Sequence, residues 1–92
     1  MSEIPPRERK IIAYLHHLFI LFLELVYAIP VEGHFSIEEG FTFKFLKLDK
    51  TQRKLLQEAI SIIELILHTL DYETESKITE NEVKLAWRKR RT

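Results

Sequence analysis

The chain has 92 residues, a mass of 11.0 kDa and a formal net charge of zero, which suffices for one domain but not for a second core. Hydrophobic residues make up 46% of it, which excludes an intrinsically disordered chain. The absence of cysteine excludes disulfide frameworks, thiolate metal sites and cysteine catalysis. We find no internal repeat or low-complexity segment and therefore expect a single domain over residues 1–92.

A long helix is predicted over about 6–29. Pro5 and Pro6 suit the first turn of a helix, and the residue before Pro30 is disfavoured from helical geometry, so the helix should end near it. Apolar residues in this segment recur at alternating spacings of four and three, which is typical of one helix face. This apolar seam consists of Ile11, Leu15, Leu18, Phe22, Leu25 and Ile29.

A β-hairpin is predicted over about 34–48. Phe41, Phe43 and Phe45 alternate with polar residues, which is the period of a strand with one buried face. Gly40 can supply the positive φ angle of a tight turn before this strand. Two strands alone are marginally stable in water, so we expect a helix to cover one face of the hairpin.

A second helix is predicted over about 50–71, because its apolar residues form one wide face and its charged residues the other. Asp49 and Gln52 have the spacing of a capping box at its start. The segment that follows is polar and is expected to be a connector. Thr79 and Glu82 also have capping-box spacing, and they predict a last, short basic helix over about 80–91.

These elements predict an α+β fold that is predominantly helical, in the order helix, hairpin, helix, helix. A helix of the first segment's length is about 36 Å long, whereas a globule of this size has a radius of gyration of about 12 Å. The first helix is apolar around most of its circumference, so the rest of the chain can scarcely cover it. We therefore expect a homodimer, or a subunit of a larger complex, with the apolar seam as its interface.

Residues 11–29 are also just long enough to cross a bilayer, which leaves a small membrane-anchored protein as an alternative. Glu24 would then lie within the hydrocarbon, where an acid costs a few kcal/mol or more. The second helix also needs an apolar partner, which the first helix supplies. We therefore favour a soluble cytoplasmic protein with no membrane contact.

Basic residues are concentrated in two segments, 44–54 and 83–92, with net charges of +4 and +5. Such clusters can neutralise phosphates, so DNA or RNA is a candidate partner. The candidate contact residues are Lys84, Arg88, Lys89, Arg90 and Arg91, followed by Lys47, Lys50, Arg53 and Lys54. The leading hypothesis is a self-associating accessory or regulatory protein that contacts nucleic acid. The alternative is a scaffold subunit without nucleic-acid contact, in which these charges are only solvated.

No catalytic motif is present in the sequence. The four histidines show neither metal-ligand spacing nor a nearby carboxylate at such spacing, and no serine lies in a nucleophile-elbow motif. We therefore expect a protein that is not an enzyme and that has no metal and no cofactor.

Overall fold

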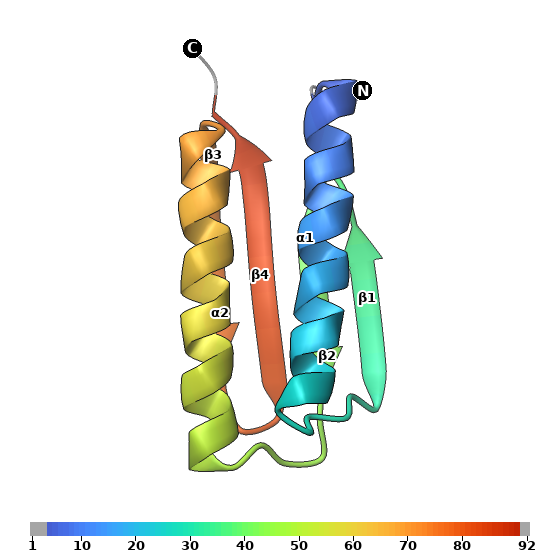
Figure 1. Cartoon of the computed structure of the whole chain (residues 1–92), viewed down its shortest axis with the longest axis vertical. Helices are drawn as coiled ribbons and strands as arrows, with labels where there is room; N and C mark the ends of the chain where they lie inside the picture. Colours follow the sequence, from blue (N-terminus) through green and yellow to red (C-terminus); the bar gives the residue numbers. More distant parts are fainter. Residues whose placement is uncertain (1–3, 91–92) are drawn as a thin grey trace.

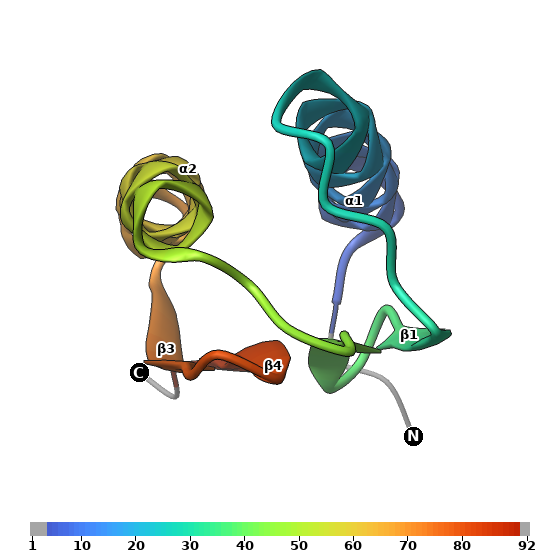
Figure 2. The same cartoon turned by 90° about the horizontal axis from the view of Figure 1, so that it is seen from below.

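The computed structural model describes residues 4–90 and contains two helices packed on one face of a four-stranded antiparallel sheet (Figures 1 and 2). No described element covers the other face of the sheet. In chain order the elements are α1 (Pro6–Leu25), β1 (Glu32–Ser36), β2 (Gly40–Lys44), α2 (Lys50–Thr69), β3 (Tyr72–Ile78) and β4 (Glu82–Lys89).

The sheet has the strand order β1-β2-β4-β3, and every neighbouring pair is antiparallel. Phe41 pairs with Phe35 on one side and with Leu85 on the other, so these apolar residues point to the same face, toward the helices. Gly40 has a φ of +136°, and a Cβ at this position would collide with the carbonyl oxygen of Leu85. This part of the hairpin therefore requires glycine.

The fold consists of two α-β-β units, although the sequence shows no repeat. Each helix has 20 residues, and buried positions recur at a spacing of 44 residues. Strands β2 and β4 of the two units pair at the centre of the sheet, so an approximate two-fold axis passes between them. The equivalent buried pairs are Ile12 and Leu56, Phe19 and Ile63, Leu23 and Leu67, Phe41 and Leu85, and Phe43 and Trp87.

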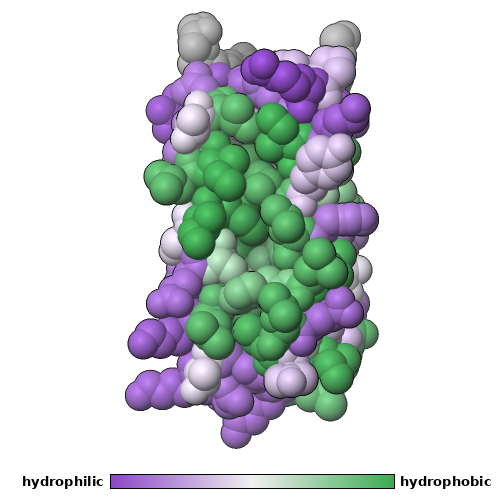
Figure 3. Space-filling model, viewed as in Figure 1, coloured by the Kyte–Doolittle hydropathy of each residue, from purple (hydrophilic) through white to green (hydrophobic). Residues whose placement is uncertain are grey.

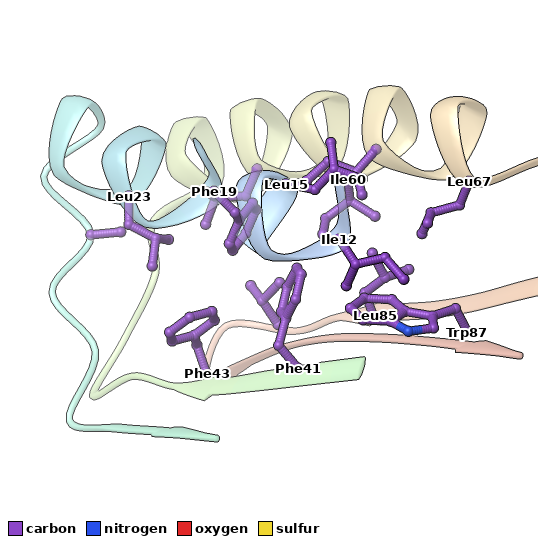
Figure 4. Close-up of a cluster of buried hydrophobic side chains, with 14 of the residues drawn as sticks. Ile12, Leu15, Phe19, Leu23, Phe41, Phe43, Ile60, Leu67, Leu85 and Trp87 are labelled. Carbon is purple, nitrogen blue, oxygen red and sulfur yellow. The ribbon is translucent and has the colours of Figure 1, made fainter. Parts of the chain in front are cut away.

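The core lies between the helix layer and the sheet and is rich in aromatic rings (Figure 4). Phe41 is 2% exposed and stacks on Phe19 of α1 at 4.9 Å between ring centroids, with Trp87 edge-on at 6.0 Å. His16 stacks on Phe35 at 3.9 Å and fills the gap between α1 and β1. Burial, with a smaller contribution from the charge of His17, lowers the pKa of His16 and so disfavours the charged form of the ring.

Helix α1 ends at Leu25, four residues before the predicted end near residue 29. Tyr27 has a left-handed φ of 59°, its N–H donates to Glu24, and the next N–H, of Ala28, donates to Leu23. These two bonds form a Schellman motif, which usually has glycine at the left-handed position. Because tyrosine occupies that position here, the sequence gives no signal for the helix end.

The prediction of a predominantly helical fold with a third helix is wrong. Helices account for 46% of the described residues and strands for 29%, and residues 82–89 form β4 instead of a helix. Val83, Leu85 and Trp87 alternate with exposed or half-buried residues, which is the period of a strand. Thr79 accepts a hydrogen bond from the Asn81 N–H within the β3–β4 turn and caps no helix.

The expected polar connector after the second helix is also wrong, because most of it is strand β3. Only Tyr72 in this strand is buried, and its other residues are half-buried or exposed. The strand lies at the edge of the sheet and is paired on one side by β4. Its pairing therefore depends on β4 and not on an apolar pattern of its own.

Candidate functional site

The helix face that points away from the sheet exposes large apolar side chains. Leu18, Leu21 and Leu25 of α1 are 59%, 55% and 74% exposed, and Ile62 and Leu65 of α2 are 61% and 66% exposed. Monomeric soluble proteins rarely expose a contiguous apolar patch of this extent unless it has a function. This face is therefore the strongest candidate site in the described part of the chain.

The apolar face is hollowed between the two helices into a groove of about 580 Å³, which we call the helix groove. Figure 3 shows the hydrophobic band along the middle of the molecule and hydrophilic side chains at its ends. The only charged residue that lines the groove is Glu58. Its other lining residues are Leu15, Leu18, Phe19, Leu21, Phe22, Leu25, Leu55, Ala59, Ile62, Ile63 and Ile66.

Four pairs of groove residues are related by the same 44-residue spacing as the core, whereas Leu25 and Leu55 have no counterpart in the groove. Leu18 corresponds to Ile62 and Phe22 to Ile66, and both pairs line the groove. Leu21 corresponds to Leu65 in the same way, and both are exposed. The exposed apolar face is thus a feature of both α-β-β units.

The predicted seam of the first helix is divided between the core and the surface. Leu15 is buried, whereas Ile11 and Phe22 are half-buried against the core. Leu18 and Leu25 are exposed in the helix groove. Ile29 is 81% exposed but lies in the loop after α1, outside the groove.

The predicted basic residues are not brought into one patch. Residues 47–54 lie at the start of α2, at the lower end of the molecule in Figure 1, whereas β4 ends at the upper end. The long axis of the molecule measures 40 Å, so Arg88, Lys89 and Arg90 at the end of β4 are held far from residues 47–54. Lys84 is the third residue of β4 and pairs with Thr42, so it lies toward the lower end. Lys84 and Arg88 lie on the sheet face away from the helices, because they alternate with buried residues of β4.

Several of these basic residues already have partners within the protein. The Arg88 guanidinium donates to Glu73 at 2.8 Å, and Arg90 lies 3.9 Å from both Asp71 and Glu73. Arg53 donates to the Leu48 carbonyl at 2.8 Å. Lys54 is exposed at the start of α2, and Arg91 lies outside the described residues.

Lys89 belongs to a polar cluster between α1 and the sheet that the sequence does not indicate. Its ammonium group donates to Glu8 Oε1 at 2.9 Å, and the Tyr72 hydroxyl donates to the same oxygen at 2.8 Å. Burial acts to raise the pKa of Glu8, but the hydrogen bonds from Lys89 and Tyr72 outweigh it, and the pKa lies below its usual value. The cluster joins α1, β3 and β4, so Lys89 has a structural role.

We expect Glu8→Gln to change the pH dependence of stability. The Glu8 pKa is lower in the folded state, so its ionisation stabilises the fold above the unfolded pKa, and that contribution is lost as pH falls through the folded pKa. In urea unfolding followed by circular dichroism, Glu8→Gln should be less stable than the wild type at pH 7. The difference should shrink below about pH 4.5. A difference that stays constant down to about pH 3 would contradict this assignment.

A second polar chain joins α2 to the edge strand β3. The Thr74 hydroxyl donates to Glu64 Oε2 at 2.9 Å and lies 2.8 Å from Nε2 of His68. Thr74 lies on the strand at the open edge of the sheet, and its hydroxyl is hydrogen-bonded to both Glu64 and His68. Within residues 4–90, no group of three or more His, Asp or Glu residues is arranged to hold a metal ion.

The comparisons with known proteins add no family. Neither a family model nor a curated protein nor a solved structure matches the chain. Neither described helix is both long and apolar enough to cross a membrane. The helix groove therefore has to be interpreted from its own geometry.

Proposed function

We propose that this protein is a small association module that works as a homodimer, with the helix face as the interface between two copies. The observation that carries the proposal is the helix groove, whose walls are apolar and exposed on both helices. Burial of such surface is the main driving force of protein association. A second copy offers the same apolar face, as a two-fold dimer requires.

The size of the helix face suits a stable dimer. The molecule extends 40 by 20 Å in the two directions of this face (Figure 3). This outline is comparable to the area of about 800 Å² that each partner buries in a specific interface of standard size. The apolar centre and the hydrophilic ends of the face also match the usual division into core and rim.

Charges at the border of the face are complementary between two copies. Gln52 of α2 donates to the carbonyls of Val26 and Tyr27, which places the end of α1 beside the start of α2. The helices α1 and α2 run antiparallel (Figure 1). Glu24 lies two residues before Val26, and Lys54 lies two residues after Gln52, so both residues lie at the same level along the helix axes. A two-fold axis along the groove stacks α1 on the partner's α2 and places Glu24 opposite Lys54 of the partner subunit, twice per dimer.

Exchange of these two charges tests the proposed arrangement. We expect Glu24→Lys and Lys54→Glu each to raise the dimer dissociation constant about fivefold to tenfold, because each variant places like charges opposite one another twice. The double variant should recover affinity close to that of the wild type. Sedimentation velocity over a concentration series measures all four proteins.

The matched control is the pair Lys84→Glu and Glu75→Lys. Both residues are exposed on the sheet face away from the helices, Lys84 on β4 and Glu75 on β3, so neither lies in the proposed interface. These variants carry the same charge changes and should leave the dimer unaffected. If the two single interface variants weaken the dimer and the double variant weakens it further, the proposed pairing is wrong.

The proposal does not extend to nucleic acid. The basic residues are split between two ends, and Arg88, Lys89 and Arg90 have carboxylate partners. Contact with DNA or RNA stays a prediction from the sequence.

A further inference from the structure

A second exposed apolar group lies outside the helix groove, at the lower end of the molecule in Figure 1. We call it the apolar tip: Tyr27, Ile29 and Val31 in the α1–β1 loop, and Leu46 in the β2–α2 loop. Tyr27, Ile29 and Leu46 are 85%, 81% and 83% exposed, which exceeds every large hydrophobic residue of the groove. None of these four residues contributes to the core, so core packing does not explain why these positions are apolar.

The backbone of the apolar tip is held in place by hydrogen bonds. The Val31 N–H donates to Lys44 at 2.8 Å, and Asn81 donates from its side chain to the Leu46 carbonyl at 3.1 Å. Gln52 holds the carbonyl of Tyr27 at 3.1 Å. Tyr27 has a left-handed φ of 59°, which a non-glycine residue adopts only at a cost. The fold thus presents these side chains to solvent on fixed loops.

Three lysines lie beside the residues of the apolar tip along the chain. Lys44 ends β2, Lys47 follows Leu46, and Lys50 begins α2, and all three are exposed. They form no ion pair with any residue in 4–90. Three of the nearby carboxylates interact with other groups. Asp49 caps α2, Glu80 lies 3.8 Å from Arg53, and Glu82 lies 3.6 Å from Lys77. Glu32 is the cross-strand neighbour of Lys44.

We propose that this end of the molecule docks on the surface of an anionic phospholipid bilayer. Aliphatic side chains and a tyrosine would enter the boundary between headgroups and acyl chains, and the lysines would contact anionic headgroups. Each lysine near such a surface adds attraction that combines with apolar insertion. Nucleic acid would contact the lysines but would leave three highly exposed aliphatic side chains in water. An anionic lipid surface accounts for both the apolar side chains and the lysines.

This docking differs from the membrane span that the sequence disfavours, because no helix enters the bilayer. It does not depend on the dimer, since each copy carries a complete apolar tip. A two-fold axis along the helix groove would also place both tips at the same end. The dimer could then contact one membrane with two tips, which strengthens binding through effective concentration.

Co-sedimentation with vesicles tests the proposal on the full chain. We expect binding to vesicles of phosphatidylcholine with about a third phosphatidylserine, and at least tenfold weaker binding to pure phosphatidylcholine. The variant Ile29→Ser/Leu46→Ser should bind the anionic vesicles at least tenfold more weakly, because both changes remove inserted apolar groups. Both positions are exposed, so the fold should be retained, as circular dichroism can verify.

The charge control compares two double variants with equal changes in net charge. Lys47→Glu/Lys50→Glu should lose binding to anionic vesicles, whereas Arg7→Glu/Lys10→Glu, at the start of α1 and at the opposite end of the molecule, should retain it within about twofold. Absence of binding to anionic vesicles by the wild type overturns the proposal. So does binding that Ile29→Ser/Leu46→Ser leaves unchanged, or binding through the three lysines to DNA or RNA alone. Sedimentation velocity on the same proteins reports the dimer separately.

Discussion

The double variant Leu18→Lys/Leu25→Lys is expected to be a folded monomer. Both side chains line the helix groove and are more than half exposed, so lysine at either position can reach water in the isolated chain. In the proposed dimer the same two lysines would be buried against a partner face whose only charged groove residue is Glu58, so at least one of them would lack a counter-charge. A buried unpaired charge costs several kcal/mol, so the dissociation constant should rise at least a hundredfold.

Light scattering after size-exclusion chromatography measures this change, and circular dichroism reports the fold. The matched control is Ile29→Lys, because Ile29 is equally apolar and 81% exposed but lies outside the groove. We expect Ile29→Lys to remain dimeric. A double variant that keeps the wild-type mass while folded would show that the helix groove is not the interface.

The second large effect is expected at the centre of the core. Phe41→Ala should lower the free energy of unfolding by about 3 to 5 kcal/mol, the usual cost of a buried Phe→Ala change. Phe41 is 2% exposed and contacts rings from α1, β2 and β4, so neighbouring side chains cannot easily collapse into the space. Since small domains are stable by about 5 to 15 kcal/mol, this variant should be partly unfolded well below the wild-type melting temperature.

Thr42→Ala provides the control for Phe41→Ala on the same strand. Thr42 follows Phe41 and points to the opposite, open face of the sheet, where it pairs with His34 and Lys84. Its replacement should cost about 1 kcal/mol or less, the range of strand propensity. Urea unfolding compares the two variants, and equal losses would contradict the placement of Phe41 in the core.

The sequence is informative wherever local chemistry and tertiary structure agree. The helix start at Pro6, the capping box of Asp49 and Gln52 and the alternation of Phe41 and Phe43 are all present in the structure. Each of these signals acts within four residues, so the pattern and the fold depend on the same contacts.

The last third of the chain could not be assigned in the same way. Val83, Ala86 and Trp87 fit one helix face, whereas Val83, Leu85 and Trp87 fit one strand face, and an eight-residue segment does not decide between them. Pairing with β2 decides it, through contacts about 40 residues apart in the sequence. The same contacts create the second α-β-β unit, which the sequence does not reveal.

The candidate site was predicted in part. The sequence predicts that the first helix has more apolar surface than the rest of the chain can cover. Leu18, Phe22 and Leu25 of the predicted seam line the groove. The contribution of α2 was not predicted, because the wide apolar face of the second helix, which includes Ile62 and Ile66, was expected to pack against the first helix. Only the spacing of the two helices above the sheet shows that these residues are left uncovered.

The mass of the wild-type protein in solution tests the central claim most directly. Sedimentation equilibrium at micromolar concentrations should give twice the chain mass of 11.0 kDa, with dissociation only on dilution. A single species of 11.0 kDa at concentrations up to the millimolar range would contradict the proposed homodimer.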